Sequence, residues 1–223
     1  MSETEELKVE LLPPDKIKND LKFKIIVIGD AGVGKSCLTS KASKDIFNEK
    51  YSPTISFEFL SFNVKINDKI IKLEIWDTCG QEVYQSLIRS YYTKSSLAMI
   101  VYSICSRESF IHAESWLKEV KTNSNPDIKI FLIGNKADLE EEREVELSEA
   151  KKFMEENGIL YFSEASAKSG LNTKEIFIEA AKILYNEFLK YSSKGANNEI
   201  NEENLPIPVP LKKNKIEKKQ GCC

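Results

Sequence analysis

The stretch Gly29-Asp30-Ala31-Gly32-Val33-Gly34-Lys35-Ser36 decides how this chain folds. It matches the pattern G-x-x-x-x-G-K-[ST], in which backbone N–H groups wrap closely around phosphate groups. A short apolar run, Phe23–Ile28, comes directly before it, and a segment that can be helical follows. The helix N-terminus adds partial positive charge, Lys35 would reach the β- and γ-phosphates, and the Ser36 hydroxyl would coordinate Mg²⁺. These flanks predict a nucleotide-phosphate site rather than a glycine-rich turn that binds nothing.

Strand-like and helix-like patterns alternate along the rest of the chain. Apolar runs typical of buried strands recur at Leu97–Tyr102, Lys129–Ile133 and, more weakly, Ile159–Phe162. Amphipathic helical patterns lie at Arg107–Asn123, Glu146–Glu156 and Thr173–Leu189. This alternation is typical of an α/β fold with a mostly parallel sheet.

One segment breaks the alternation and predicts a β-hairpin. Ser56–Ile66 and Ile70–Trp76 flank Asn67-Asp68, a plausible turn. Side chains alternate between the two faces of a strand, which places Phe59 and Trp76 among polar neighbours. Two interpretations remain open, because either a helix covers these rings or they form an exposed aromatic patch for a partner.

The hairpin leads into a second candidate site, Trp76-Asp77-Thr78-Cys79-Gly80-Gln81. Asp77 ends an apolar stretch, where P-loop enzymes place a carboxylate that positions the metal. Gly80 can let its backbone approach the γ-phosphate, and Gln81 could orient an attacking water. The separation of this motif from Lys35 along the sequence supports the prediction of a site that hydrolyses a nucleotide.

A third motif, Asn135-Lys136-Ala137-Asp138, follows another predicted strand and favours binding of guanine over adenine. An ionised Asp138 can accept hydrogen bonds from guanine N1–H and N2–H, whereas adenine would leave the carboxylate unpaired. Such a site can discriminate by about 10⁴ or more. Asn135 would connect this loop to the phosphate loop and Lys136 would cover the base. Ser166-Ala167-Lys168 could supply a backbone N–H to guanine O6.

These motifs, in this order, resemble the Ras superfamily of small GTPases, and within it the Rab family. Ser86-Leu87-Ile88-Arg89-Ser90-Tyr91-Tyr92 is similar to the Rab switch II helix, and the terminal Cys222-Cys223 is similar to the Rab ending. The resemblance implies that Thr54 is the second protein hydroxyl on Mg²⁺ and that Phe47 packs on the guanine. It also implies an aromatic effector triad of Phe59, Trp76 and Tyr91.

The resemblance carries definite expectations for fold and site. We expect a P-loop NTPase fold with a six-stranded, mostly parallel sheet, one antiparallel edge strand and about five flanking helices. The expected catalytic residues are Lys35, Thr54 and Gln81, and the expected metal ligands are Ser36, Thr54 and Asp77. The residues expected to bind GTP or GDP are Asp30, Ala31, Gly32, Val33, Gly34, Lys35, Ser36, Cys37, Phe47, Thr54, Gly80, Asn135, Lys136, Asp138, Ser166, Ala167 and Lys168.

Length and composition agree with one domain carrying tails. The chain has 223 residues, 41% of them hydrophobic, which is enough for a full core. Its net charge of −3 argues against a nucleic-acid binder. No apolar run is long enough to cross a membrane. We expect an extension at 1–20 that packs only loosely, a GTPase domain at 21–190, whose core we expect to be monomeric, and a flexible tail at 191–223.

The tail predicts a membrane anchor. Within Leu211–Lys219 five lysines face one glutamate, just before Cys222 and Cys223. Two prenyl chains on these cysteines would anchor stably, and the lysines would favour an anionic leaflet. The Rab resemblance therefore implies the cytoplasmic face of intracellular membranes, cycling with the cytosol. Two free thiols on a disordered tail are the alternative.

The arginine count shapes the expected mechanism. The chain has only Arg89, Arg107 and Arg143, none near the phosphate loop in sequence. We therefore expect slow intrinsic hydrolysis that an activating protein accelerates. The other implied partners are an exchange factor, GTP-dependent effectors, a prenyltransferase and an escort protein or GDP-dissociation inhibitor (GDI). An ATP-using enzyme and a nucleotide-locked scaffold are the alternatives, disfavoured by the base motif and by Gln81 respectively.

Overall fold

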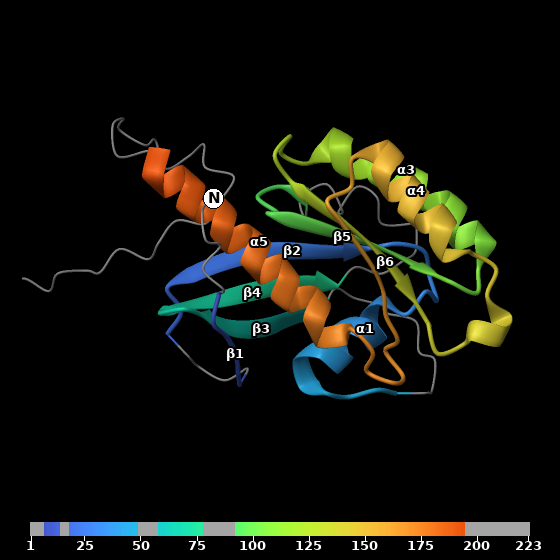
Figure 1. Ribbon diagram of the computed structural model, residues 1–223, viewed down its shortest axis with the longest axis horizontal. Helices are drawn as coiled ribbons and strands as arrows, with labels where there is room; N and C mark the ends of the chain where they lie inside the picture. Colours follow the sequence, from blue (N-terminus) through green and yellow to red (C-terminus); the bar gives the residue numbers. More distant parts are fainter. Residues whose placement is uncertain (1–6, 14–17, 49–57, 78–91, 195–223) are drawn as a thin grey trace, which may run out of the picture.

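A seven-stranded sheet runs through the molecule, with helices packed against both of its faces (Figure 1). The computed structural model describes residues 7–13, 18–48, 58–77 and 92–194. The strands are β1 (Val9–Leu12), β2 (Leu21–Ile28), β3 (Glu58–Ile66), β4 (Lys69–Asp77), β5 (Leu97–Ser103), β6 (Lys129–Asn135) and β7 (Tyr161–Glu164). The helices are α1 (Lys35–Lys44), α3 (Arg107–Asn123), α4 (Leu147–Asn157), α5 (Thr173–Lys194) and the short 3₁₀ helix η2 (Glu140–Glu142).

The strand order is β1-β3-β4-β2-β5-β6-β7. Strands β4, β2, β5, β6 and β7 pair in parallel, whereas β3 pairs antiparallel with β4 and β1 antiparallel with β3. The predicted α/β architecture of the P-loop type is therefore confirmed. The parallel strands bring their carboxyl ends to one edge of the sheet, which is where ligands bind in such folds.

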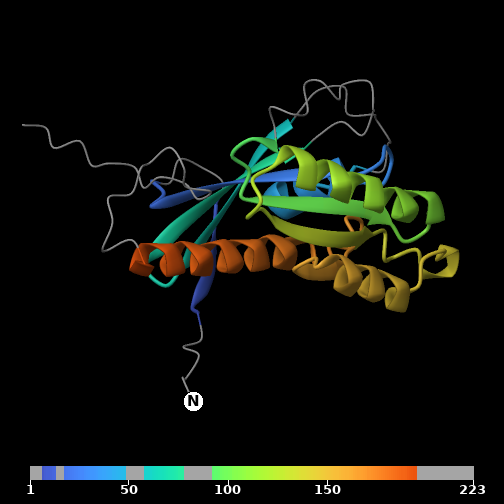
Figure 2. The ribbon, with the colours of Figure 1, turned by 90° about the horizontal axis from the view of Figure 1, so that it is seen from above.

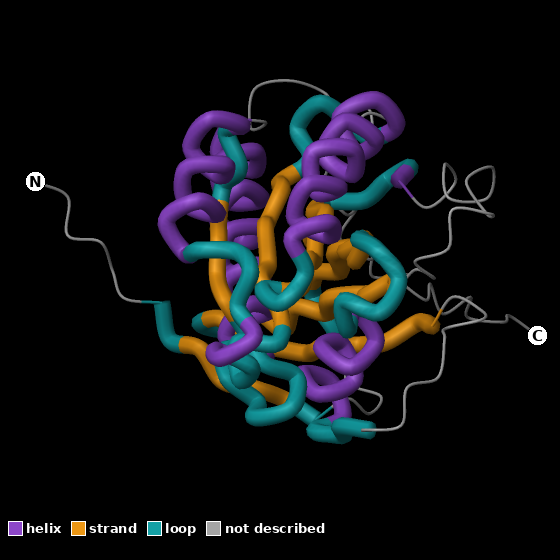
Figure 3. The backbone as a smooth tube through the Cα atoms, turned by 90° about the vertical axis from the view of Figure 1, so that its right-hand side faces the viewer, coloured by secondary structure: helices purple, strands orange, loops and turns teal. Residues whose placement is uncertain are grey.

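Strand β2 shows why helices must cover both faces. Its residues Phe23, Ile25 and Val27 join one apolar cluster, and Ile26 and Ile28 join the other. Helices α1 and α5 complete the first cluster, while α3 and α4 complete the second. The sheet lies between α3 and α5 in Figure 2, and Figure 3 shows the strands in the centre of the domain. A strand buried on both faces is a nearly continuous apolar run, as the second half of β2, Ile25–Ile28, is.

The predicted hairpin is present as β3 and β4. The alternate residues Leu60, Phe62, Val64 and Ile66 are buried, as are Ile71, Leu73 and Ile75 of the partner strand. Asn67 has a φ of 52°, a left-handed conformation that asparagine tolerates in tight turns. The alternation of side chains between the two faces of each strand therefore predicted the core face of this hairpin correctly.

Strand β1 corrects, for Val9–Leu12, the expectation of a loose extension at 1–20. Its register pairs Val9 with Ile66 and Leu12 with Asn63, so β3 is an interior strand and the sheet has seven strands instead of six. The backbone N–H of Asn67 donates to Lys8 O at 2.9 Å. Val9 and Leu7 pack against the cluster below α5. This apolar contact, added to the backbone pairing, holds the extension in place.

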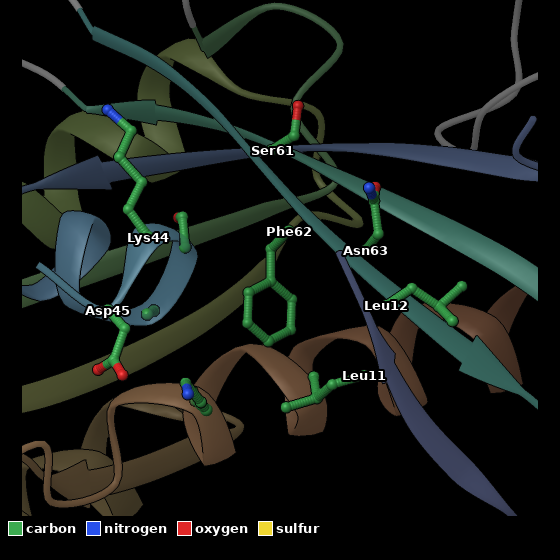
Figure 4. Close-up of a pocket in the computed structure, with 10 residues that line it drawn as sticks. Leu11, Leu12, Lys44, Asp45, Ser61, Phe62 and Asn63 are labelled. Carbon is green, nitrogen blue, oxygen red and sulfur yellow. The ribbon is translucent and has the colours of Figure 1, made fainter. Parts of the chain in front are cut away.

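The added strand also forms one wall of a pocket of about 290 Å³ (Figure 4). Strand β3 forms a second wall, and the ends of α1 and α5 complete it. Its lining residues are Leu11, Leu12, Ala42, Ser43, Lys44, Asp45, Ser61, Phe62, Asn63 and Lys174. None of these lining residues was expected to bind nucleotide.

Among the described residues, no helix combines the length and apolar character needed to cross a membrane.

Replacing Val9 tests whether β1 stabilises the fold. Val9→Ala removes two methyl groups from a half-buried site, so it should lower the free energy of unfolding by about 1 kcal/mol. Glu10→Ala, at the adjacent exposed position, should change it by less than about 0.5 kcal/mol. Urea denaturation measures both, and equal losses would show that the packing of β1 contributes nothing.

Candidate functional site

The predicted phosphate loop connects β2 to α1 at the carboxyl edge of the sheet. Its conformation depends on glycine, because Gly29, Gly32 and Gly34 have φ values of 138°, 78° and 92°. These left-handed or strained conformations are poorly accessible to other residues. Val33 is buried between them, whereas Ala31 and Gly32 are exposed. The loop is therefore anchored at its centre and presents its backbone at the surface.

Two of these glycines are also required by their close neighbours. A Cβ atom on Gly29 would lie 2.1 Å from the carbonyl oxygen of Val101 in β5. A Cβ atom on Gly34 would lie 2.4 Å from Nδ2 of Asn135. Gly32 has no such neighbour within 4 Å. The loop is thus pressed against β5 and β6 at its two ends and open in the middle, which is the form of a cradle for an anion.

Lys35 begins α1 and lies over the loop. Its side chain is only 5% exposed, and its Nζ donates to the carbonyl oxygens of Gly29 and Asp30, both at 2.7 Å. The ammonium group therefore lies against the first two residues of the loop, on the side chain of the first residue of α1. A cation and a helix N-terminus in one place suit a bound phosphate group.

Asn135, the last residue of β6, connects three loops. Its Nδ2 donates to the carbonyl oxygen of Val33 at 2.8 Å and to that of Gly34 at 3.3 Å. Its Oδ1 accepts from the backbone N–H of Ala167 at 3.3 Å. The residue is 1% exposed, so these bonds are shielded from water. The expected connection between the base motif and the phosphate loop is present.

The base motif is held from a second side by the loop after β7. Ser166 Oγ donates to Asp138 Oδ1 at 2.5 Å and accepts from the backbone N–H of Ser169 at 2.9 Å. The backbone N–H of Ala137 donates to Ala165 O at 3.0 Å. Asp138 is itself exposed and Lys136 half-buried. The carboxylate is therefore fixed in orientation while its other oxygen can accept further bonds.

The residues expected to hold the metal lie beside the phosphate loop. Asp77 ends β4 and is fully buried, and Ser36 is half-buried in the first turn of α1. Burial raises the pKa of the Cys37 thiol, the Asp77 carboxylate raises it further, and Lys136 lowers it. Cys37 therefore lies within electrostatic reach of both Asp77 and Lys136. Carboxylate and hydroxyl oxygens are ligands that Mg²⁺ accepts, so these residues fit the expected ion.

The aromatic residues of the hairpin have different environments. Phe59 is 48% exposed, which confirms that it faces solvent, whereas Trp76 is half-buried against the α3 side of the core. Their rings meet edge to face with centroids 5.6 Å apart. Lys24 Nζ lies 4.9 Å from the centroid of the Trp76 ring, and Lys72 Nζ lies 5.8 Å from the centroid of the Phe59 ring. Burial lowers the pKa of Lys24, which Glu74 partly opposes.

Phe47, which the resemblance places on the guanine, follows the end of α1. It is half-buried and packs against the cluster formed by α1 and α5. Two further residues expected to bind nucleotide follow Ser166 in the loop after β7. Lys168 is exposed and Ala167 is buried. Thr54, Gly80, Gln81, Tyr91, Cys222 and Cys223 lie outside the described residues.

Sequence reasoning missed two residues of α3 that contact the phosphate loop. His112 Nδ1 lies 2.7 Å from Asp30 Oδ2, and Trp116 Nε1 donates to Asp30 Oδ1 at 2.7 Å. In the sequence, Trp116 fits the apolar face of the amphipathic helix predicted at Arg107–Asn123, which does not indicate a contact with the phosphate loop. His112 is the single histidine of the chain, and it lies half-exposed on the flank of an amphipathic helix. That position was the available signal for a contact beyond the helix.

Comparison with known protein families agrees with this geometry. The family model described as Ras family matches residues 24–186. The match begins within β2 and ends within α5, so it spans every described residue expected to bind nucleotide.

Two glycine substitutions separate backbone strain from crowding in the loop. Gly32→Ala should lower the free energy of unfolding by about 1–2 kcal/mol, because only the left-handed conformation opposes it. Gly34→Ala should lower it further, because the new methyl group must also displace the amide of Asn135. Chemical denaturation of both variants measures the difference. Equal losses would mean that Asn135 can move away without cost.

Proposed function

Because this chain belongs to the Ras family of small GTPases, we propose that it is a Rab-type switch that regulates vesicle trafficking between intracellular membranes. In this proposal it binds GTP with Mg²⁺, hydrolyses it to GDP and phosphate, and has different partners in the two states. The observation that carries the nucleotide choice is the fixed Asp138 carboxylate. Ser166 holds one of its oxygens, and Asn135 connects its loop to the phosphate loop.

The geometry supports a guanine nucleotide over an adenine one. A carboxylate is an acceptor only, and guanine offers two adjacent donors on one edge, at N1 and N2. Adenine has an acceptor at N1, so the two would repel each other. A site that hydrogen-bonds one base and would leave this carboxylate unpaired against the other discriminates strongly. Lys35 and the loop backbone would hold the β- and γ-phosphates, while Ser36 and Asp77 would hold Mg²⁺.

The described arginines support the proposal that hydrolysis needs an activating protein. Both terminal nitrogens of the Arg107 guanidinium, Nη1 and Nη2, donate to Glu149 at 2.6 Å. Arg143 is similarly held by Glu140 and Glu164 at 2.7 Å. Each of these guanidinium groups is therefore occupied by carboxylates. A partner that supplies an arginine to the γ-phosphate would stabilise the transition state in the usual way for GTPases.

The Rab assignment and the trafficking role rest on the sequence. Both the exposed ring of Phe59 and the half-buried ring of Trp76 suit a contact surface for GTP-dependent effectors. Tyr91 would complete this surface, and Thr54 would couple it to the γ-phosphate. We propose that Cys222 and Cys223 are geranylgeranylated, which places the protein on the cytoplasmic face of a membrane. A GDI or escort protein would then carry it through the cytosol.

Replacing Asp138 tests the nucleotide choice. Asp138→Asn should weaken GDP binding by about a hundredfold or more, because the charge is lost and the new amide nitrogen cannot accept from guanine. It should strengthen binding of xanthosine diphosphate, whose C2 carbonyl can accept from the new amide. Glu141→Gln, an exposed carboxylate in the nearby η2, is the matched control and should change neither affinity. Competition with a fluorescent nucleotide measures both. Wild-type protein that binds ADP as tightly as GDP would contradict the proposal.

Serine substitution tests the lipid anchor. Wild-type protein from eukaryotic cells should carry two geranylgeranyl groups and partition into membranes, because two chains anchor stably where one does not. The Cys222→Ser, Cys223→Ser variant should lose both the added mass and the membrane fraction. Cys105→Ser, which changes a half-buried cysteine of the domain, should behave like wild type. Mass spectrometry and flotation measure the two effects. A double variant that still floats with membranes would refute the proposed anchor.

A further inference from the structure

Asp30, the second residue of the phosphate loop, has both carboxylate oxygens engaged by α3. Trp116 Nε1 donates to Oδ1, and His112 Nδ1 lies within hydrogen-bond distance of Oδ2, each at 2.7 Å. His112 and Trp116 are four residues apart, so both lie on one face of the helix. A carboxylate that accepts from two donors is held in position and in orientation.

The main chain of Asp30 contacts Lys35, the lysine predicted to bind phosphate. Lys35 Nζ donates to the carbonyl oxygen of Asp30 at 2.7 Å. Lys35 Nζ also donates to the carbonyl oxygen of Gly29, the residue before Asp30 in the loop. A continuous path of hydrogen bonds therefore runs from α3 through the side chain and main chain of Asp30 to the ammonium group of Lys35.

The helix is a firm base for this path. Ala113, Leu117 and Val120 of α3 are at most 2% exposed and belong to the apolar cluster under the helix. The Trp116 ring packs against the same cluster, so the direction of its N–H is fixed by the core. His112 is 44% exposed at its side chain and is the less constrained donor. Trp116 should therefore contribute more than His112.

We propose that His112 and Trp116 are positioning residues that act through Asp30 to hold the phosphate loop and Lys35 ready for the β-phosphate. This inference rests on the proposed binding of guanine nucleotides. It predicts that α3 influences the phosphate end of the site selectively. The base end is held by other bonds, those of Asn135 and Ser166, which the contact with α3 does not touch.

Nucleotides that differ in their phosphates separate this role from a general effect on folding. Asp30→Ala and Trp116→Phe should each weaken GDP binding by about tenfold, as expected for a supporting residue behind a binding group. Neither should change the affinity for GMP, which lacks the β-phosphate. Glu149→Gln is the matched control, since it breaks the bond between Arg107 of α3 and helix α4 without touching the loop. That variant should leave both affinities unchanged.

A double-mutant cycle then tests whether Trp116 acts through Asp30. In the Asp30→Ala background, Trp116→Phe should have no further effect on GDP binding, because its acceptor is already gone. Additive losses would overturn the proposal, and so would equal losses of GDP and GMP affinity. The Trp116 indole N–H signal in NMR spectra should move in Asp30→Ala protein, whereas the signal of Trp76, the other tryptophan, should not. An unmoved Trp116 signal would also overturn the proposal.

Nucleotide binding by the wild-type protein distinguishes a failure of the positioning role from a failure of the proposed function. Wild-type protein that binds no guanine nucleotide would overturn both. Wild-type protein that binds GDP tightly, with Asp30→Ala binding it equally well, would overturn only the positioning role of α3.

Discussion

The buried amide of Asn135 is the interaction on which the arrangement of this site depends. It satisfies two carbonyl oxygens at the end of the phosphate loop and accepts from the loop after β7, so one side chain determines the relative positions of three loops. Buried polar groups without partners are costly, so moving any of these loops away from Asn135 would carry a free-energy cost. The absence of a side chain at Gly34 follows from the same constraint, because the amide occupies the space that a Cβ atom would need.

Most of this arrangement could be predicted from the sequence, because the decisive patterns are local. The phosphate loop lies between a strand and a helix only a few residues away, and Asn135 ends an apolar strand. Helix α3 begins and ends at the predicted residues, Arg107 and Asn123. Strand β7 begins two residues later than expected, because Ile159 still bonds to the end of α4 through Met154 O. Such end effects depend on neighbours that periodicity does not describe.

What the sequence did not indicate depends on contacts between distant residues. Strand β1 has only four residues and lies between charged residues and two prolines, so its alternation was too short to identify. It is a strand because the edge of β3 and an apolar cluster were available to it. The contacts of Asp30 with His112 and Trp116 span 82 and 86 residues, and both partners had an ordinary explanation as parts of an amphipathic helix. Pairings of this kind require the three-dimensional arrangement.

The strand order has one consequence for the length of the ligand. The phosphate loop follows β2 and the base motif follows β6, and a single strand, β5, lies between them. Neighbouring strands are spaced at about 4.8 Å, so the two loops begin roughly 10 Å apart. In the proposed nucleotide complex, this separation suits one sugar between a base and its phosphates. Side chains would then select the base, and the spacing of the strands would favour a ligand of this length.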